Sequence, residues 1–140
     1  MALGDVTLFE EFSDEISNVH DLDADTFKMA LISDASPSLA TATPNLSDFT
    51  ECTPGGNYTS GGNTLTTPTF TEAAGTATFD FDDLTISQNA SNPTDARWGL
   101  VINSTQANAA VGLVDLGSTY DMTTGDLVFT VNASGMFTLA

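Results

Sequence analysis

Alternating apolar and polar residues recur through most of the chain after residue 26, and this two-residue period constrains the fold more than any other feature. Successive side chains of a β-strand point to opposite faces, so the alternation predicts strands that bury one face. The segments with this pattern are 26–33, 64–67, 76–81, 84–86, 97–103, 109–116, 126–131 and 136–139. Gly, Pro, Asn and Asp separate them, without the helical period of a crossover connection. The sequence therefore predicts a mainly β protein that forms an antiparallel β-sandwich or a small barrel.

One stretch near the N-terminus has a helical period instead. Its apolar residues recur at steps of three and four and form one stripe, while acids occupy the other faces. The stripe consists of Leu8, Phe9, Phe12, Ile16 and Val19. We predict one short N-terminal helix over residues 7–18, with Thr7 and Glu10 as a capping box. The stripe either packs on the protein's own sheet or docks on a neighbouring molecule, and in the second case its first four members are the partner contacts.

The predicted elements suit one domain over residues 1–140. Its parts are the helix at 7–18, the first strand at 26–33, a long loop at 34–63 and a β-rich body at 64–140. Leu46 and Phe49 are expected to pin the long loop to the core. Within the body the apolar parity reverses at Asp82 and Asp83, which predicts a bulge or a break there.

The charge of the chain is strongly one-sided. Nineteen Asp and Glu residues face one lysine, Lys28, and one arginine, Arg97, for a formal net charge of −17. Such a chain repels phosphate backbones and anionic lipid surfaces, so we expect no nucleic-acid partner and no membrane partner. The acidity serves solubility, or it matches a basic partner surface or divalent cations. Arg97 is expected to pair with a carboxylate.

No set of residues has the pattern of a catalytic site, and we expect no catalytic residues, no cofactor and no metal ligands. The single histidine, His20, and the single cysteine, Cys52, lack a second ligand at metal-binding spacing. The acidic run 21–25 resembles the start of a calcium loop, but Thr26 and Ile32 stand where that loop needs Gly and Glu. Paired carboxylates are the one mechanism chemically open, and we expect a protein that is not an enzyme.

The start of the chain does not have the pattern of a secretory signal. Residues 1–12 lack a basic region and carry acids where a signal peptide is apolar. A single cysteine permits no intrachain disulfide. We therefore expect a protein made in the cytoplasm, and we attribute its Asn-x-Ser/Thr triplets to composition rather than to glycosylation.

Aromatic residues leave a different class of function open. A carbohydrate-binding or adhesive β-sandwich would use exposed aromatic rings as stacking platforms, and the candidates are Tyr58, Trp98 and Tyr120. Trp98 lies in the segment 97–103, which is apolar enough to be a central strand. We expect Trp98 to anchor the core. An exposed Trp98 would favour sugar binding, and a buried one would argue against it.

Several short segments that together span most of the chain are typical of one family. They are Asn18 to Leu22, Asp25 to Leu31, Asn57 to Gly62, Trp98 to Ile102 and Phe129 to Leu139. Through them the chain resembles the small β-rich virion structural proteins of tailed bacteriophages, in particular capsid decoration or cement proteins. The chain departs from that family in its acidity, because related proteins are expected to carry more lysine.

The resemblance implies a non-enzymatic structural protein on the capsid surface of the virion, made in the host cytoplasm. Its partner would be the major capsid protein, and it would form a homo-oligomer, for which a trimer is the form to test. The same resemblance fits a tail or head–tail connector component. A carbohydrate-binding or adhesive β-sandwich module is the alternative from another class.

Overall fold

The fold is mainly β. The computed structural model of the protein describes residues 5–139, so the outermost residues of the expected domain, 1–4 and 140, lie outside the described residues. The strands of the described chain are β1 (Val6–Leu8), β2 (Phe27–Ile32), β3 (Asn63–Thr64), β4 (Thr69–Ala73), β5 (Thr76–Asp80), β6 (Leu84–Ile86), β7 (Ala96–Asn103), β8 (Ala109–Tyr120), β9 (Leu127–Phe129) and β10 (Phe137–Leu139). Its helices are α1 (Phe12–Glu15) and the 3-10 helix η1 (Leu46–Asp48).

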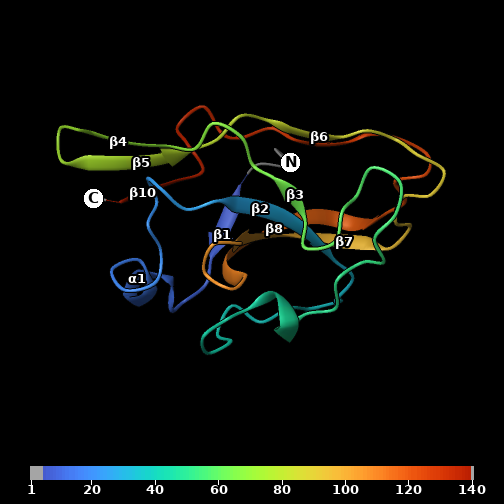
Figure 1. Ribbon diagram of the computed structural model, residues 1–140, viewed down its shortest axis with the longest axis horizontal. Helices are drawn as coiled ribbons and strands as arrows, with labels where there is room; N and C mark the ends of the chain where they lie inside the picture. Colours follow the sequence, from blue (N-terminus) through green and yellow to red (C-terminus); the bar gives the residue numbers. More distant parts are fainter. Residues whose placement is uncertain (1–4, 140) are drawn as a thin grey trace.

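The strands form two layers (Figure 1). One layer is a five-stranded sheet with the order β1-β8-β7-β2-β3. The other layer contains the three-stranded sheet β10-β5-β4 and the two-stranded sheet β6-β9. Along the chain β5 is followed by β6, and β9 by β10, so the two sheets form one interrupted ribbon. The pairings among the described strands are antiparallel, and the sheets keep open edges. The predicted mainly β class is confirmed, as a sandwich-like arrangement rather than a barrel.

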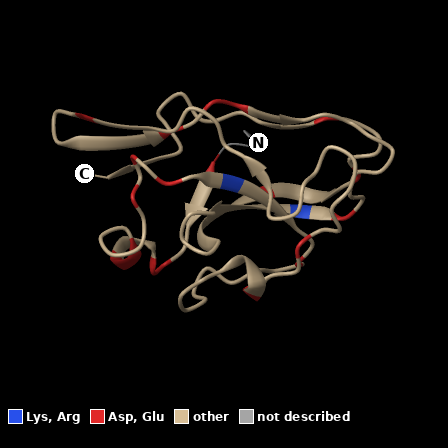
Figure 2. Ribbon diagram, viewed as in Figure 1, with Lys and Arg blue, Asp and Glu red and all other residues tan. Residues whose placement is uncertain are grey.

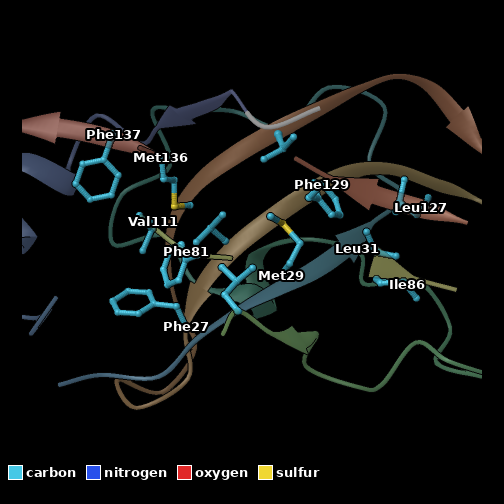
Figure 3. Packing of buried hydrophobic residues seen from close by; sticks show 14 of the residues in the cluster. Phe27, Met29, Leu31, Phe81, Ile86, Val111, Leu127, Phe129, Met136 and Phe137 are labelled. Atoms are coloured by element: carbon cyan, nitrogen blue, oxygen red, sulfur yellow. The ribbon is translucent and has the colours of Figure 1, made fainter. Parts of the chain in front are cut away.

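The central core lies between the two layers (Figure 3). β2 points Phe27, Met29 and Leu31 into it, as the alternation predicted. The second layer contributes Phe79 from β5 and Phe129 from β9. Removing such side chains from water stabilises a fold by about 25 cal/mol per Å² of apolar surface. Because the core residues come from both layers, their packing fixes how the layers lie on one another.

A second core covers the outer face of the five-stranded sheet. Ala30 and Ile32 of β2 face it, because they alternate with the central-core residues of the same strand. The segment after β2 returns across this face, and its residues Leu46 and Phe49 pack there. The expectation that these two side chains pin the long loop is confirmed. Both faces of β2 and β7 are therefore covered, which explains their nearly continuous apolar sequences.

The predicted short N-terminal helix is confirmed as α1, but its expected bounds, residues 7–18, are wrong. Its first part is the strand β1, which pairs with β8, and α1 covers only about one turn. Gly112 permits the pairing, because a Cβ there would lie 2.5 Å from Cγ1 of Val6 and 2.8 Å from the carbonyl oxygen of Thr7. The predicted capping box does not form, since Thr7 lies in β1 and the N-cap residue Glu11 makes no side-chain cap. Pairing at the sheet edge outweighs a helix too short to be stable alone.

Two other predictions of strand position are confirmed. The first strand, expected at 26–33, is β2. The break expected at Asp82 and Asp83 separates β5, which ends at Asp80, from β6, which begins at Leu84 in another sheet. The reversal of apolar parity therefore marks the point where the ribbon of the second layer is interrupted.

Two boundaries in the C-terminal half differ from the prediction. β8 does not end before Gly117 but continues to Tyr120, with a shift of register opposite Arg97. The positive φ of Gly117, 77°, places the irregularity at a residue without a side chain. The segments predicted at 126–131 and 136–139 do not form a hairpin, because residues 132–135, with Gly135 at a φ of 87°, connect β9 to β10 in a different sheet. The pattern of side chains along a strand indicates which face is buried, but it does not indicate which strands pair.

β4 has no counterpart among the predicted strands. Its five residues are all exposed, so the sequence carries no buried face that would reveal a strand. It forms because Ala74 and Gly75 fold it back onto β5, with φ values of 52° and 84° that suit a two-residue hairpin turn. The hairpin, here called the β4–β5 arm, extends from one end of the second layer (Figure 1).

Candidate functional site

A surface groove lies between the turn that follows α1 and the β4–β5 arm. Its lining residues are Ile16, Ser17, His20, Asp21, Leu22, Asp23, Phe70 and Leu139. Phe70 and Val128 are the two large hydrophobic residues that stay exposed within residues 5–139, at 37% and 39%. The groove therefore combines an apolar wall, an acidic wall and the free edge of a sheet.

A buried hydrogen-bond network lies next to the groove, at the end of β7. Its centre is Asn103, which is completely buried. The Oδ1 of Asn103 accepts from the backbone N–H groups of Thr105 and Gln106, so its amide nitrogen faces the other way. That nitrogen donates to Oδ2 of Asp25 over 2.6 Å and to Nδ1 of His20 over 3.0 Å. The network ties the turn after α1 to β7.

The network determines the tautomer of His20. Because Nδ1 accepts from Asn103, the neutral ring carries its proton on Nε2. That atom lies 3.7 Å from Oε2 of Glu15, and both atoms are buried without a hydrogen-bond partner in the described chain. The two groups face one another at a distance too long for a hydrogen bond.

Burial and local charge set the protonation states in this network. Burial lowers the pKa of His20, although the nearby Asp25 carboxylate acts in the opposite direction. Burial raises the pKa of Glu15, and the neighbouring charges of Glu11 and Asp14 raise it further. Burial also acts to raise the pKa of Asp25, but hydrogen bonds, that from Asn103 first, lower it overall. At neutral pH the site therefore holds an ionised Asp25 next to an uncharged imidazole.

The acidic run 21–25 forms a tight turn. Oδ1 of Asp21 accepts from the backbone N–H groups of Asp23 and Ala24, and Oδ2 of Asp25 accepts from the N–H of Asp21. These carboxylates therefore satisfy backbone donors of their own turn. Within residues 5–139 no group of three or more His, Cys, Asp and Glu side chains is placed to hold a metal ion.

The residues predicted as partner contacts do not share one surface. Phe9 is buried in the outer core beside Phe49, and Phe12 is buried in the central core against Phe137. Leu8 and Ile16 are half-buried and pack against the central core. Of the four, Ile16 alone lines the groove. Phe9 and Phe12 thus serve the fold of their own chain.

The aromatic residues predicted as sugar platforms are engaged within the chain. Tyr58 is buried, and its hydroxyl donates to Oε1 of Glu51 over 2.8 Å while accepting from the N–H of Leu31. Trp98 is half-buried against the outer core, and the guanidinium of Arg97 lies 4.4 Å from its ring centroid. The hydroxyl of Tyr120 donates to the carbonyl of Asp126. Burial of Tyr58 contradicts its predicted role, and Trp98 packs against the outer core while it stays partly exposed.

Arg97 pairs with Asp115 across β7 and β8, as predicted from the scarcity of cations. The ion pair and a hydrogen bond from the N–H of Gly117 hold the pKa of Asp115 below its usual range. Arg97 is therefore occupied by a partner in its own sheet.

Comparison of the chain with protein-family models, with curated proteins and with solved structures finds no match. No helix within residues 5–139 is long and apolar enough to cross a membrane. The features of the molecule that bear on its function are therefore the groove, the open edge of β4 and the distribution of charge.

Asn103 and Phe70 are the site residues that the sequence did not reveal. Asn103 ends an apolar strand and begins an Asn-x-Ser triplet, so its sequence neighbourhood suggests an exposed turn. Phe70 is surrounded by Thr and Pro. A signal for Phe70 was its place between two threonines after Pro68, which is typical of an edge strand.

Acidification is expected to destabilise the protein below about pH 6.5 through His20. A histidine with a lowered pKa binds its proton only after unfolding, so unfolding becomes more favourable as pH falls below the ordinary value of 6.5. The contribution to the slope approaches about 1.4 kcal/mol per pH unit for one proton. Glu15 contributes with the opposite sign, because its raised pKa lets the folded state keep a proton that the unfolded state loses.

Urea unfolding of the wild type and of His20→Gln between pH 5 and pH 8 isolates this contribution. The chain has one histidine, so the variant removes the only imidazole and leaves Glu15 and Asp25 in place. We expect a flatter pH dependence for the variant between about pH 5.5 and 7. Equal slopes for the two proteins would contradict a lowered pKa of His20.

Proposed function

We propose that the protein is a non-enzymatic structural protein of a phage particle, a capsid decoration or cement protein that binds the major capsid protein. The observation that carries the proposal is the β4–β5 arm, whose outer strand leaves a five-residue edge open beside an acidic groove. A neighbouring chain can add to a sheet at such an edge. The resemblance to virion proteins of tailed phages supports the particle as the place of that neighbour.

The edge of β4 differs from the other sheet edges of the described chain. The other edge strands, β1, β3, β6, β9 and β10, have two or three residues each. β4 has five, all exposed, and contains neither Lys nor Pro. Natural proteins shield long open edges with such residues or cover them with another segment. We infer that a neighbouring molecule covers β4.

The distribution of charge supports an outward position on a shell. Figure 2 shows acids spread over the loops and strands, while Lys28 and Arg97 lie on β2 and β7. An acidic surface is repelled by packaged nucleic acid, so it suits the outside of a capsid. Copies that bind repeated sites on the shell would stabilise it by mass action.

The copy number of the protein in purified particles of the phage that encodes it tests this proposal. Quantitative mass spectrometry compares it with the major shell protein, and a tail-tip protein of the same particles calibrates the low end. We expect a copy number comparable with that of the shell protein. A few copies per particle would place the protein in the tail or head–tail connector, and absence from the particle would overturn the virion proposal.

A further inference from the structure

We propose that the free edge of β4 and the groove beside it bind an extended, basic segment of a partner protein, which adds a fourth strand to the sheet β10-β5-β4. The inference deepens the proposed function and rests on it for the existence of a partner. It concerns the chemistry of that partner, and four properties of the described residues support it: backbone geometry, the position of Phe70, charge, and the contrast with Val128.

The backbone of β4 offers hydrogen-bonding groups to a new strand. A two-residue turn closes on a hydrogen-bonded pair, here Ala73 with Thr76. Bonded and non-bonded pairs alternate along an antiparallel ladder, so the N–H and C=O groups of Phe70 and Glu72 point to the free edge. Within residues 5–139 no strand pairs with this side of β4. An added strand would satisfy these groups along the length of the arm.

The same register places Phe70 and Glu72 on the face that looks toward the groove. Phe70 lies opposite Phe79, which is buried in the central core, and its ring contacts that of Phe79 at 6.4 Å between centroids. Side chains of an added strand that point to this face would therefore stand beside Phe70 and Glu72. An apolar side chain suits the position beside Phe70, which is 37% exposed, and a basic one suits the position beside Glu72.

Charge identifies the occupant as basic. Asp21 and Asp23 line the groove and are exposed, and Glu72 lies on β4 itself. The two cations of the chain, Lys28 and Arg97, belong to β2 and β7 of the other layer. Each exposed ion pair contributes at most about 1 kcal/mol, but several carboxylates of one sign also accelerate the encounter with a cation.

A second copy of the chain is the less suitable occupant. Pairing two β4 edges would bring together two chains that each carry a net charge of −17, with one Glu72 on each of the paired strands. Like charges placed opposite one another destabilise a sheet. A basic strand gains from the same carboxylates when its lysine or arginine side chains lie on the same face as its apolar ones, two residues apart along the strand.

Binding of a Val–Lys peptide of repeating Thr-Val-Thr-Lys to the full chain tests the inference, because its Val and Lys side chains share one face of an extended strand. Calorimetry at low and at high salt measures its affinity, with a Val–Glu peptide as the charge control. A Val–Lys peptide N-methylated at every internal backbone nitrogen is the control for strand addition, because it keeps the charge and lacks backbone donors on both edges. We expect saturable binding of the Val–Lys peptide that weakens with salt, and no binding of either control.

Phe70→Ala and Val128→Ala are a matched pair of variants. Both remove an exposed apolar side chain without changing charge, and Val128 lies on β9 outside the groove. We expect Phe70→Ala to weaken the Val–Lys peptide about tenfold, and Val128→Ala to leave its affinity unchanged. Equal affinities of the two variants, equal binding of the N-methylated peptide, or self-association of the chain in place of peptide binding would overturn the inference.

The peptide experiment tests the basic-strand site, and the particle experiment tests the capsid function, so the two can fail independently. Peptide binding by a chain that is absent from particles would retain the basic-strand site and reject the capsid function. Shell-like copy number together with failure of the Val–Lys peptide would retain the capsid function and reject this site.

Discussion

Replacing Phe79 by Ala is expected to lower the free energy of unfolding by about 3–5 kcal/mol. Phe79 is completely buried at the centre of the second layer. Its ring lies 4.6 Å from that of Phe81 and 5.1 Å from those of Phe27 and Phe137, measured between centroids. Truncation removes these contacts and leaves a cavity that rings from both layers cannot fill without moving.

Phe70→Ala is the matched control for this prediction. Phe70 lies directly opposite Phe79 on β4 but remains 37% exposed, so its truncation is expected to cost about 1 kcal/mol or less. Urea unfolding of the two variants and the wild type, followed by far-ultraviolet circular dichroism, measures the difference. Similar losses for both variants would show that the second layer does not pack on the central core as described.

Replacing Asn103 by Asp is expected to lower the free energy of unfolding at neutral pH by about 3–5 kcal/mol. The substitution keeps the size of the side chain and keeps the acceptor for the N–H groups of Thr105 and Gln106. It replaces the amide donor by an oxygen that faces Oδ2 of Asp25 and Nδ1 of His20. Two carboxylates would then meet in a buried site without the donor that now separates them.

Asn132→Asp is the control for the change of charge. Asn132 is exposed; its Oδ1 accepts from the N–H of Ser134, a role that a carboxylate keeps, and its amide nitrogen donates to Oδ1 of Asp5 over 3.4 Å, so the control also places two carboxylates together, but in solvent. Its stability is expected to change by about 0.5 kcal/mol or less. The deficit of Asn103→Asp relative to this control should shrink as pH falls toward about 4, where the introduced carboxyl group gains a proton and can donate. A deficit independent of pH would show that the lost packing, rather than the charge, is responsible.

The burial of Asn103 also bears on N-glycosylation, for which the Asn-x-Ser/Thr triplet is the acceptor pattern. The triplet that begins at Asn103 has the Asn-x-Ser/Thr pattern, but its side chain is completely buried in the network. A glycan could not be attached there without unfolding the end of β7. This supports the interpretation of the triplet as composition.

The strands that could be predicted are those that bury at least one face. β2 and β7 alternate or are apolar throughout, because one or both of their faces are covered, and both were predicted close to their observed bounds. β4 was missed, because a strand that buries neither face leaves no period in its sequence. β1 was mistaken for a helix, because three residues of a strand followed by one helical turn space their apolar side chains as a helix does.

The candidate site was less predictable than the fold for a related reason. Its acids were visible in the sequence. Asn103, however, meets Asp25 and His20 across 78 and 83 residues of chain. No local pattern records such a contact, because it depends on β2 and β7 being neighbours in one sheet.

The sequence by itself determined the mainly β class, the covered strands β2 and β7, and the strong acidity of the chain. These properties are local or additive: alternation indicates which face of a strand is buried, and charge is a sum over residues. Only the tertiary structure decided that Val6–Leu8 joins the edge of β8, that Asn103 organises a buried network, and that β4 has an open edge among residues 5–139, beside Asp21 and Asp23. Pairing and burial of this kind involve segments that are far apart in the chain. Their contributions to the free energy of folding arise only when the two layers pack together.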